Sequence, residues 1–409
     1  MDLYDSPEEA TFRADVRAWL AEQAPRHVAN GTGAGGKSAQ AVAMPDHVAA
    51  ARRWQRTLYD GGWAGITLPA EYGGRGGTAI QQVIFNEEQA RFGINSGPLL
   101  IGLQMVIPTL LAHGSDAQRA AHVDPILRGE ELWCQLFSEP GAGSDLASLG
   151  TRAVVDGDEY VVNGQKVWNS FAQVADYGIL LARTDPSLPK HKGITYFIVP
   201  MDTPGFDIRP LRQITGIAHF NEVFMTDVRI PADNVVGEVD AGWPVARTTL
   251  GSERAMISGG SSGSSTTRDD IIALAKTRGV EVDPSVRQGI AEAYARISIL
   301  EYLGFRLRTA LSRGEMPGQE ASVMKLAFSQ NAARTGDLVM EIMGADGMLW
   351  GEDAIDHSRW QNYFLGQYAV RIGGGTDEVQ RNIIAEQVLG LPRELVDNRG
   401  APWNEQSKS

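Results

Sequence analysis

The sequence predicts an α+β protein that is mainly helical and has three parts in chain order. Helical hydrophobic spacing fills residues 1–128, which we expect to form an N-terminal helical domain. Short runs rich in β-branched residues follow over residues 129–237 and predict a middle antiparallel β-barrel or sandwich. Helical spacing returns over residues 238–395 and predicts a C-terminal four-helix bundle, with a polar tail at 396–409. A chain of 409 residues is long enough to bury a large core in several domains.

Charge and cysteine content exclude several classes of function. The net charge of -13, from 37 basic and 50 acidic residues, argues against binding to nucleic acid or to an anionic membrane. The single cysteine, Cys134, excludes an intrachain disulfide and a cysteine zinc site, and the 7 histidines form no ligand-spaced cluster with acids, so we expect no metal. The N-terminus is acidic and no window is long enough to span a membrane, which predicts a cytoplasmic protein.

The N-terminal part has a well-marked first helix. Ser6-Pro7-Glu8-Glu9 supplies a serine cap, a proline at the first helical position and a glutamate three residues after the cap. Residues 24–46 are rich in Gly, Ala and Ser and predict a long loop. The apolar stripe of the first helix consists of Phe12, Val16, Trp19 and Leu20, and further helical patterns occur around Trp54–Leu58, Ile80–Phe92, Leu99–Ala112 and Asp116–His122.

The middle part is predicted to be antiparallel because its strands follow one another without helices. Asp156-Gly157-Asp158 and Asn163-Gly164 are typical of hairpin turns between such strands. The absence of intervening helical patterns disfavours a parallel dinucleotide-binding fold. The predicted strands are Thr151–Val155, Glu159–Val162, Gln165–Trp168, Tyr177–Arg183, Gly193–Met201, Phe206–Leu211, Asn221–Thr226 and Val228–Ile230.

The C-terminal part shows long helices with clear caps. One helix begins near Gly242-Trp243-Pro244 and leads into Ser258–Ser265, which is poor in helix propensity. Asp283-Pro284 predicts the start of a long helix, and Thr376 predicts the start of a last helix that stops at Gly390. The long helix has an apolar stripe of Val286, Ile290, Tyr294, Ile297 and Leu300, a short helix covers Ile271–Lys276, and a partner helix covers Gln319–Met343.

The most chemically suggestive stretch is Gln135–Asp145, at the first junction between the helical and β parts. Its glycines allow backbone N–H groups to approach an anion closely, and Ser138 and Ser144 add hydroxyls. The segment therefore fits the cradle of a phosphorylated cofactor. Taken alone, Pro-Gly-x-Gly-Ser-Asp is equally good turn chemistry, and that alternative stays open at this point.

Four phrases occur in the chain in the order Gln135–Asp145, Asn163–Ser170, Phe220–Phe224 and Gly374–Asn382. Together they resemble the acyl-CoA dehydrogenase family of flavoproteins. The resemblance covers roughly residues 5–395 by the order of elements. The wording is also similar to the actinobacterial branch that handles bulky or branched acyl-CoA esters. The phrases are Gln135–Asp145, Asn163-Gly164-Gln165-Lys166-Val167-Trp168-Asn169-Ser170, Phe220-Asn221-Glu222-Val223-Phe224 and Gly374-Gly375-Thr376-Asp377-Glu378-Val379-Gln380-Arg381-Asn382.

The resemblance implies an FAD site between the β part and the bundle, with electrons passed on to an electron-transfer flavoprotein. On that basis Thr376 and Glu378 lie near the cofactor, and Gly143 and Ser144 lie by its pyrophosphate. Gln135, Phe137 and Ser138 would line the flavin, and Trp168, Asn169 and Ser170 would cover its other flank. Trp168 by itself is also consistent with a buried aromatic residue of the β part.

The reaction implied by the resemblance is α,β-dehydrogenation of an acyl-CoA thioester, which needs a carboxylate base. Many family members carry that glutamate where this chain has Gly374, so the side chain is absent here. A second family pattern places the base on the first helix of the bundle, where Glu253 matches it. The alternative for Glu253 is an exposed helix carboxylate, and its neighbour Arg254 does not face it. Ser144, Arg254 and Gly374 are the expected substrate contacts, with the Gly374 N–H available to the thioester oxygen.

One departure from the family pattern concerns assembly. An Arg-x-x-Phe-Gly phrase that often follows the first bundle helix is missing, and Lys276-Thr277-Arg278-Gly279-Val280 stands there instead. The expected assembly is therefore a homotetramer or a heterotetramer in which a homologous subunit completes the FAD site. Two alternatives of function follow: a non-catalytic partner subunit, and a flavin oxidase or monooxygenase on the same scaffold.

Overall fold

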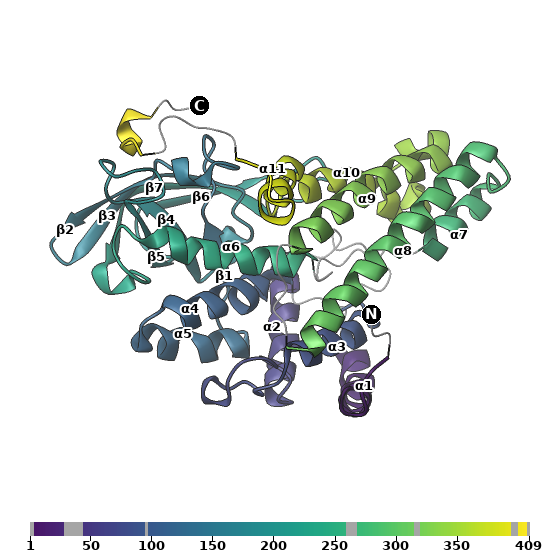
Figure 1. Cartoon of the computed structure of the whole chain (residues 1–409), viewed down its shortest axis with the longest axis horizontal. Helices are drawn as coiled ribbons and strands as arrows, with labels where there is room; N and C mark the ends of the chain where they lie inside the picture. The colour runs from purple at the N-terminus through teal and green to yellow at the C-terminus, as the bar shows by residue number, and fades with distance from the viewer. Residues whose placement is uncertain are drawn as a thin grey trace. The chain divides into compact units, whose positions relative to one another are not determined.

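The computed structural model describes residues 4–27, 44–94, 97–258, 268–314, 320–393 and 400–406. The chain divides into two compact units. One consists of Met1–Ala43, Gly76–Asn95 and Arg254–Pro392 and is helical; the other consists of Met44–Arg75, Ser96–Glu253 and Arg393–Ser409 and contains the sheet. The mainly helical α+β class with a β-sheet in the middle of the chain is confirmed (Figure 1).

The helical unit is built around α9. This helix packs against α7, α8, α10 and α11, and the long helices α8, α9 and α10 run side by side in Figure 1. The element bounds are α1 (Pro7–His27), α3 (Ala79–Ala90), α7 (Arg268–Arg278), α8 (Pro284–Ser312), α9 (Glu320–Met343), α10 (Arg359–Ile372) and α11 (Asp377–Ile383).

The predicted N-terminal caps of the helices in this unit are confirmed, and one residue of the predicted apolar stripe of α8 is corrected. Asp283 accepts hydrogen bonds from Ser285 and Val286 and starts α8, as its Asp-Pro pair predicted. Tyr294, which the apolar stripe of this helix included, is 54% exposed, and the neighbouring Ala293 is buried instead. The Arg268 guanidinium lies 4.9 Å from the Tyr294 ring, so a cation–π contact covers the aromatic face.

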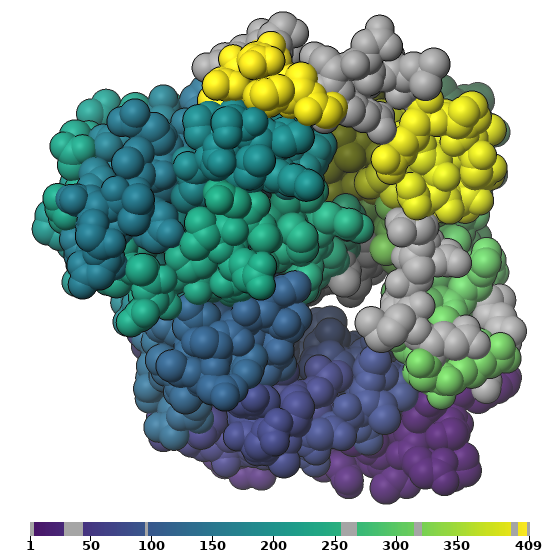
Figure 2. Space-filling model, turned by 60° about the vertical axis from the view of Figure 1, so that its left-hand side comes forward, coloured from purple at the N-terminus to yellow at the C-terminus, as the bar shows by residue number. Residues whose placement is uncertain are grey.

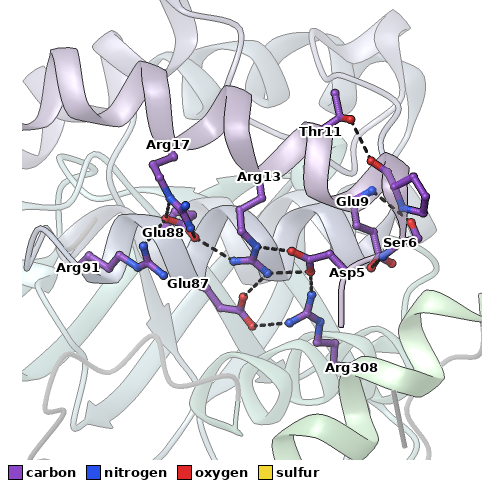
Figure 3. A network of polar contacts seen from close by, with 11 residues as sticks. Asp5, Ser6, Glu9, Thr11, Arg13, Arg17, Glu87, Glu88, Arg91 and Arg308 are labelled. Carbon is purple, nitrogen blue, oxygen red and sulfur yellow. Dashed lines mark hydrogen bonds and ion pairs between the residues drawn. The ribbon is translucent and has the colours of Figure 1, made fainter. Parts of the chain in front are cut away.

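A charged network joins α1, α3 and α8 within this unit (Figure 3). The Glu88 carboxylate is 1% exposed and accepts from Arg13 at 2.9 Å and from Arg17 at 2.9 Å. Arg13 also donates to Asp5 at 2.7 Å, and Arg308 of α8 pairs with the same Asp5 carboxylate. Hydrogen bonds from Arg13 lower the pKa of Asp5. Hydrogen bonds from Arg17 and Arg13 outweigh burial and lower the pKa of Glu88.

We expect Arg13→Met to lower the free energy of unfolding by about 2 kcal/mol at pH 7, because a nearly buried carboxylate loses a charged partner. Because the folded-state pKa values of Asp5 and Glu88 are depressed, this stabilisation is present above their ordinary values of about 4 and is lost as pH falls through the folded-state values. Thermal unfolding of wild type and variant between pH 7 and pH 3 should therefore converge on the acid side. Arg26→Met, which removes an exposed pair with Glu22 on the same helix, is the control. Equal losses in the two variants would contradict this account.

The sheet unit contains one sheet that has seven strands in the described residues. The order is β1-β4-β2-β3-β7-β6, and β5 pairs with β4. Most pairings are antiparallel, as predicted, but β1 runs parallel to β4, and β2 meets β4 in a single parallel pair. The bounds are β1 (Trp133–Leu136), β2 (Arg152–Asp156), β3 (Glu159–Val167), β4 (Tyr177–Arg183), β5 (Ile194–Pro200), β6 (Phe206–Leu211) and β7 (Phe220–Pro231), with α2 (Met44–Asp60), α4 (Ile107–His113), α5 (Asp116–Arg128) and α6 (Gly242–Ser258) among the helices.

Two predicted turns are wrong, because both lie inside continuous strands. Asn163-Gly164 is a β-bulge within β3, where the register against β7 shifts between Val162 and Gly164. A Cβ at Gly164 would lie 2.4 Å from the Thr151 hydroxyl, so the glycine serves close strand packing and not a hairpin. The predicted break between Thr226 and Val228 is likewise absent. Asp227 there takes a φ of 51°, and its N–H donates to the Asn163 side chain at 3.0 Å.

Several predictions fall mainly outside the described residues. Of the predicted loop at 24–46, the first residues belong to α1 and the last to α2. Nearly all of Ser258–Ser265 also lies outside the described part. None of the helices that the structure describes has the length and apolar character needed to cross a bilayer.

Residues 400–406 return to the sheet unit (Figure 2). The Trp403 N–H donates to the Leu188 carbonyl at 2.8 Å, and its indole N–H donates to the Ser148 carbonyl at 3.3 Å. The Trp403 ring lies 4.8 Å from the guanidinium of Arg183, which is itself buried. This part of the predicted polar tail is therefore packed against the loop between β4 and β5 and against Ser148.

Candidate active site

A buried ion pair fixes the loop that follows β1. Glu139 accepts hydrogen bonds from the backbone N–H groups of Gly150 at 2.7 Å and Thr151 at 2.9 Å. The fully buried Lys166 of β3 donates to Glu139 at 2.7 Å and to the Phe137 carbonyl at 2.9 Å. Burial alone would raise the pKa of Glu139, but the attraction of Lys166 and these hydrogen bonds outweigh burial and lower it. The carboxylate is therefore ionised and holds the loop in place.

The glycine-rich part of this loop has an open edge. Backbone hydrogen bonds of 3.1 and 3.0 Å link Glu139 and Ala142 and close a tight turn. A Cβ added at Gly141 or Gly143 would meet no atom within 4 Å. Ser144 is exposed, and its hydroxyl makes no hydrogen bond within the part of the chain that the structure describes. The edge therefore offers glycine backbone and a hydroxyl to a ligand.

The turn after β3 presents an indole ring outward and an amide inward. Trp168 adopts a φ of 63° and is 60% exposed, so its interpretation as a buried aromatic is wrong. Asn169 is buried and donates its side-chain amide to the Gln135 carbonyl at 2.7 Å. Ser138 and Ser170 are half-buried, and neither hydroxyl bonds another described residue. These predicted flavin contacts thus come from two adjoining segments of one unit.

Glu253 lies on α6 within the same unit. Its carboxylate accepts a hydrogen bond of 3.4 Å from the Gln135 side chain, and the residue is half-buried. The alternative of an exposed helix carboxylate does not fit this environment. The structure therefore brings the predicted base to the start of the Gln135–Asp145 loop.

A buried hydroxyl network anchors the face of α6 that carries Glu253. Thr249 lies one helical turn earlier, on the same face. Its hydroxyl is buried and lies 2.8 Å from that of Thr109 on α4 and 3.1 Å from that of Tyr196 on β5. His113 makes a further contact of 2.8 Å with Thr248. The backbone that carries Glu253 is thereby fixed against the unit's core.

The remaining predicted residues belong to the helical unit. Gly374 has a φ of 65°, a conformation that favours glycine over any residue with a side chain. Thr376 accepts from the Val379 N–H at 3.2 Å and caps α11, as predicted. Glu378 is exposed and pairs with Arg381 at 2.9 Å, and Arg254 is half-buried.

Comparison with known proteins decides the family. The chain matches the models for the N-terminal domain of acyl-CoA dehydrogenase over residues 6–130, the middle domain over 134–228 and the C-terminal domain over 240–389. It is 40% identical over 385 residues to the acyl-CoA dehydrogenase IpdE1 of Mycobacterium tuberculosis, covering 94% of this chain and 98% of that protein. The chain belongs to the acyl-CoA dehydrogenase family. As a member of it, the protein is a flavin-dependent oxidoreductase that acts on acyl-CoA.

Solved structures share the fold over nearly the whole chain. The Tcur3481-Tcur3483 steroid ACAD superposes with a TM-score of 0.79 at 32% identity, covering 96% of this chain and 100% of that chain. The ChsE4-ChsE5 complex from Mycobacterium tuberculosis superposes with a TM-score of 0.75 at 30% identity, covering 96% and 100%. The predicted actinobacterial branch of the acyl-CoA dehydrogenases is confirmed by these relatives.

Lys166, Asn221 and Asp377 lie within the quoted phrases, but the sequence predicted no function for them. Lys166 braces the loop after β1, and Asn221 bonds the turn after β3. Asp377, buried at the start of α11, accepts from Ser329 at 2.6 Å and from Arg371 at 3.2 Å. The available signal for Lys166 was a lysine inside a predicted strand, because a buried lysine needs a charged partner. No comparable signal marked Asn221.

Proposed function

We propose that this acyl-CoA dehydrogenase converts an acyl-CoA thioester to the 2-enoyl-CoA, with FAD as its bound cofactor and an electron-transfer flavoprotein as the acceptor. The single observation that carries the proposal is the contact between Gln135 and Glu253. It joins a candidate carboxylate base to the segment that offers glycine backbone and hydroxyls to a cofactor. The family supplies the reaction class, and this geometry supplies the candidate residues.

Glu253 is proposed to remove the α-proton of the thioester. A half-buried carboxylate is a stronger base than one in water when an apolar acyl chain covers it, because desolvation disfavours its charge. The Gln135 amide donates to one carboxylate oxygen and restrains the side chain. The carboxylate is proposed to take the proton, and the hydroxyl network around Thr249 keeps the helix backbone in place.

The residues of the sheet unit fit FAD in three respects. The open glycine edge and the Ser144 hydroxyl suit a pyrophosphate. Trp168, exposed on a constrained turn, offers an aromatic face to a planar ring system. Gln135, Phe137, Ser138, Asn169 and Ser170 would complete the contacts on this unit. Thr376 and Glu378 are proposed as further cofactor contacts on the basis of the family pattern alone. FAD, when bound, supplies the hydride acceptor for the β-hydrogen.

Gly374 is proposed to bond the thioester oxygen through its backbone N–H. Such a donor stabilises the negative charge that grows on the oxygen as the α-proton leaves, and it needs no side chain. The Gln380 side chain donates to the Gly374 carbonyl at 2.8 Å, which fixes the local backbone. Arg254 and Ser144 are proposed as further substrate contacts.

The proposed substrate is a bulky acyl-CoA ester of the steroid-derived kind. Support comes from the steroid ACAD among the similar structures and from the lack of side chains at Gly373 and Gly374. The test is anaerobic mixing of the purified, FAD-loaded protein with short, long, branched and steroid-like acyl-CoA esters, followed by the flavin absorbance. We expect bleaching with the bulky esters. A flavin that none of the esters reduces would refute the dehydrogenase function of the chain by itself.

A second candidate is a heteromeric enzyme in which this chain pairs with a homologous subunit. The observation that favours it is the positive φ at Gly374, where no glutamate can be carried without strain. The similar ChsE4-ChsE5 structure is a complex of two different proteins. The flavin-to-chain ratio of the protein purified alone discriminates the two. A fully flavinylated, active homotetramer would refute the heteromer.

A further inference from the structure

Two large residues near the end of β3 hold backbone conformations that are unfavourable for residues with side chains. Trp168 has a φ of 63° and Phe171 a φ of 60°. Such a conformation is strained for a residue with a side chain and persists only where neighbouring groups enforce it. Neither is a glycine, so the enforcement must come from contacts outside the turn.

The contacts come from Asn221, a fully buried residue of β7. Its side-chain nitrogen donates to the Asn169 carbonyl at 2.9 Å and to the Gln173 side chain, with a longer contact of 3.3 Å to the His219 carbonyl. Because backbone carbonyls only accept, the nitrogen and not the oxygen of this amide must face them. Asn221 therefore bonds the turn with a side chain that has two N–H donors.

The backbone on either side of this side chain completes the attachment. The Asn169 N–H donates to the Asn221 carbonyl at 3.1 Å, and the Phe171 N–H donates to the His219 carbonyl at 2.8 Å. The turn is thus tied to β7 through Asn169 and to His219, the residue just before β7, through Phe171. On its inner side, Asn169 reaches the Gln135 carbonyl at 2.7 Å.

As a result, the side chains of the turn point to opposite sides. Asn169 is directed inward to Gln135, and Trp168 is left exposed, with its ring edge-on to Phe220 at 5.9 Å. Leucine has the size of asparagine but no N–H donor, and aspartate would place a carboxylate against the Asn169 and His219 carbonyls. Only an amide of this length meets the observed acceptors.

We propose that Asn221 is a positioning residue for the flavin site: by bonding the Trp168–Phe171 turn, it sets the placement of Trp168 and Ser170. This inference rests on the proposed function, because the proposed function is what assigns Trp168 and Ser170 to the flavin. Asn221 itself touches neither cofactor nor substrate in this account.

The test compares Asn221→Asp with Asn163→Asp. The control sits on the adjoining strand β3, on the exposed Asn163–Asp227 pair, and makes the same chemical change away from the turn. In the apoprotein, we expect hydrogen exchange in the peptide covering residues 168–173 to be about tenfold faster in Asn221→Asp and unchanged in Asn163→Asp. The dissociation constant for FAD should rise by about tenfold or more only in Asn221→Asp.

The outcomes separate this proposal from the proposed function. If wild type binds FAD and Asn221→Asp shows wild-type exchange and affinity, the role of Asn221 is overturned while the dehydrogenase proposal stands. If wild type binds FAD but no acyl-CoA ester reduces it, the dehydrogenase proposal fails, and the affinity comparison still decides the role of Asn221. Should Asn221→Asp fail to fold, Asn221→Leu removes both N–H donors without adding a charge. Wild-type exchange and FAD affinity in that variant would overturn the role of Asn221 as well.

Discussion

Replacing Glu253 with glutamine should lower the rate of flavin reduction by a bound acyl-CoA by about 10³-fold, while FAD stays bound. Glutamine keeps the size of the side chain and can still bond Gln135, but it cannot take a proton. The measurement is anaerobic stopped-flow absorbance of the flavin band, with the flavin content of each preparation determined beforehand. The same variant should therefore bind the ester normally and fail in the chemical step.

Glu238→Gln is the matched control for this experiment, because Glu238 is exposed and precedes α6 in the chain. It should reduce its flavin at the wild-type rate. Normal flavin content together with undiminished reduction in Glu253→Gln would remove Glu253 from the mechanism. The base would then have to come from another residue or from a partner subunit.

Replacing Lys166 with methionine should lower the free energy of unfolding by about 3–5 kcal/mol. The change leaves the Glu139 carboxylate, which is 12% exposed, without its cation. Burial lowers the pKa of Lys166 more than Glu139 raises it, so this ammonium depends strongly on its partner. Urea unfolding followed by circular dichroism measures the loss.

A double variant, Glu139→Gln with Lys166→Met, separates the ion pair from packing. It should regain much of the lost stability, because no unpaired charge then remains buried. Lys190→Met serves as the surface comparison, since its pair with Asp145 is partly exposed and is expected to contribute about 1 kcal/mol or less. A loss in Lys166→Met no greater than in Lys190→Met would contradict the buried-pair account.

The sequence was most informative where local chemistry decides structure. The starts of α1, α8 and α11 were predictable because Ser6, Asp283 and Thr376 bond backbone N–H groups only two or three residues away. The bulge at Asn163-Gly164 was not, because a hairpin turn and a bulge use the same residue pair. Only the neighbouring Thr151, distant in sequence, distinguishes them.

In the candidate site, too, some residues could be predicted from the sequence and others could not. Gln135, Trp168 and Glu253 were found through phrases that the chain shares with a family, and their roles are proposals. The supporting contacts were not predictable. Lys166 and Glu139 are separated by 27 positions, and Asn221 and Asn169 by 52, and no periodic pattern relates residues so far apart. Such pairs appear only once strand register is known.

The return of residues 400–406 to the sheet unit has a practical consequence for handling the protein. Arg183 donates to the Ala147 and Leu149 carbonyls from under the Trp403 ring, and burial lowers its pKa to about 10. Cutting the chain before residue 400 would let water reach that guanidinium and weaken its hydrogen bonds to the Ala147 and Leu149 carbonyls.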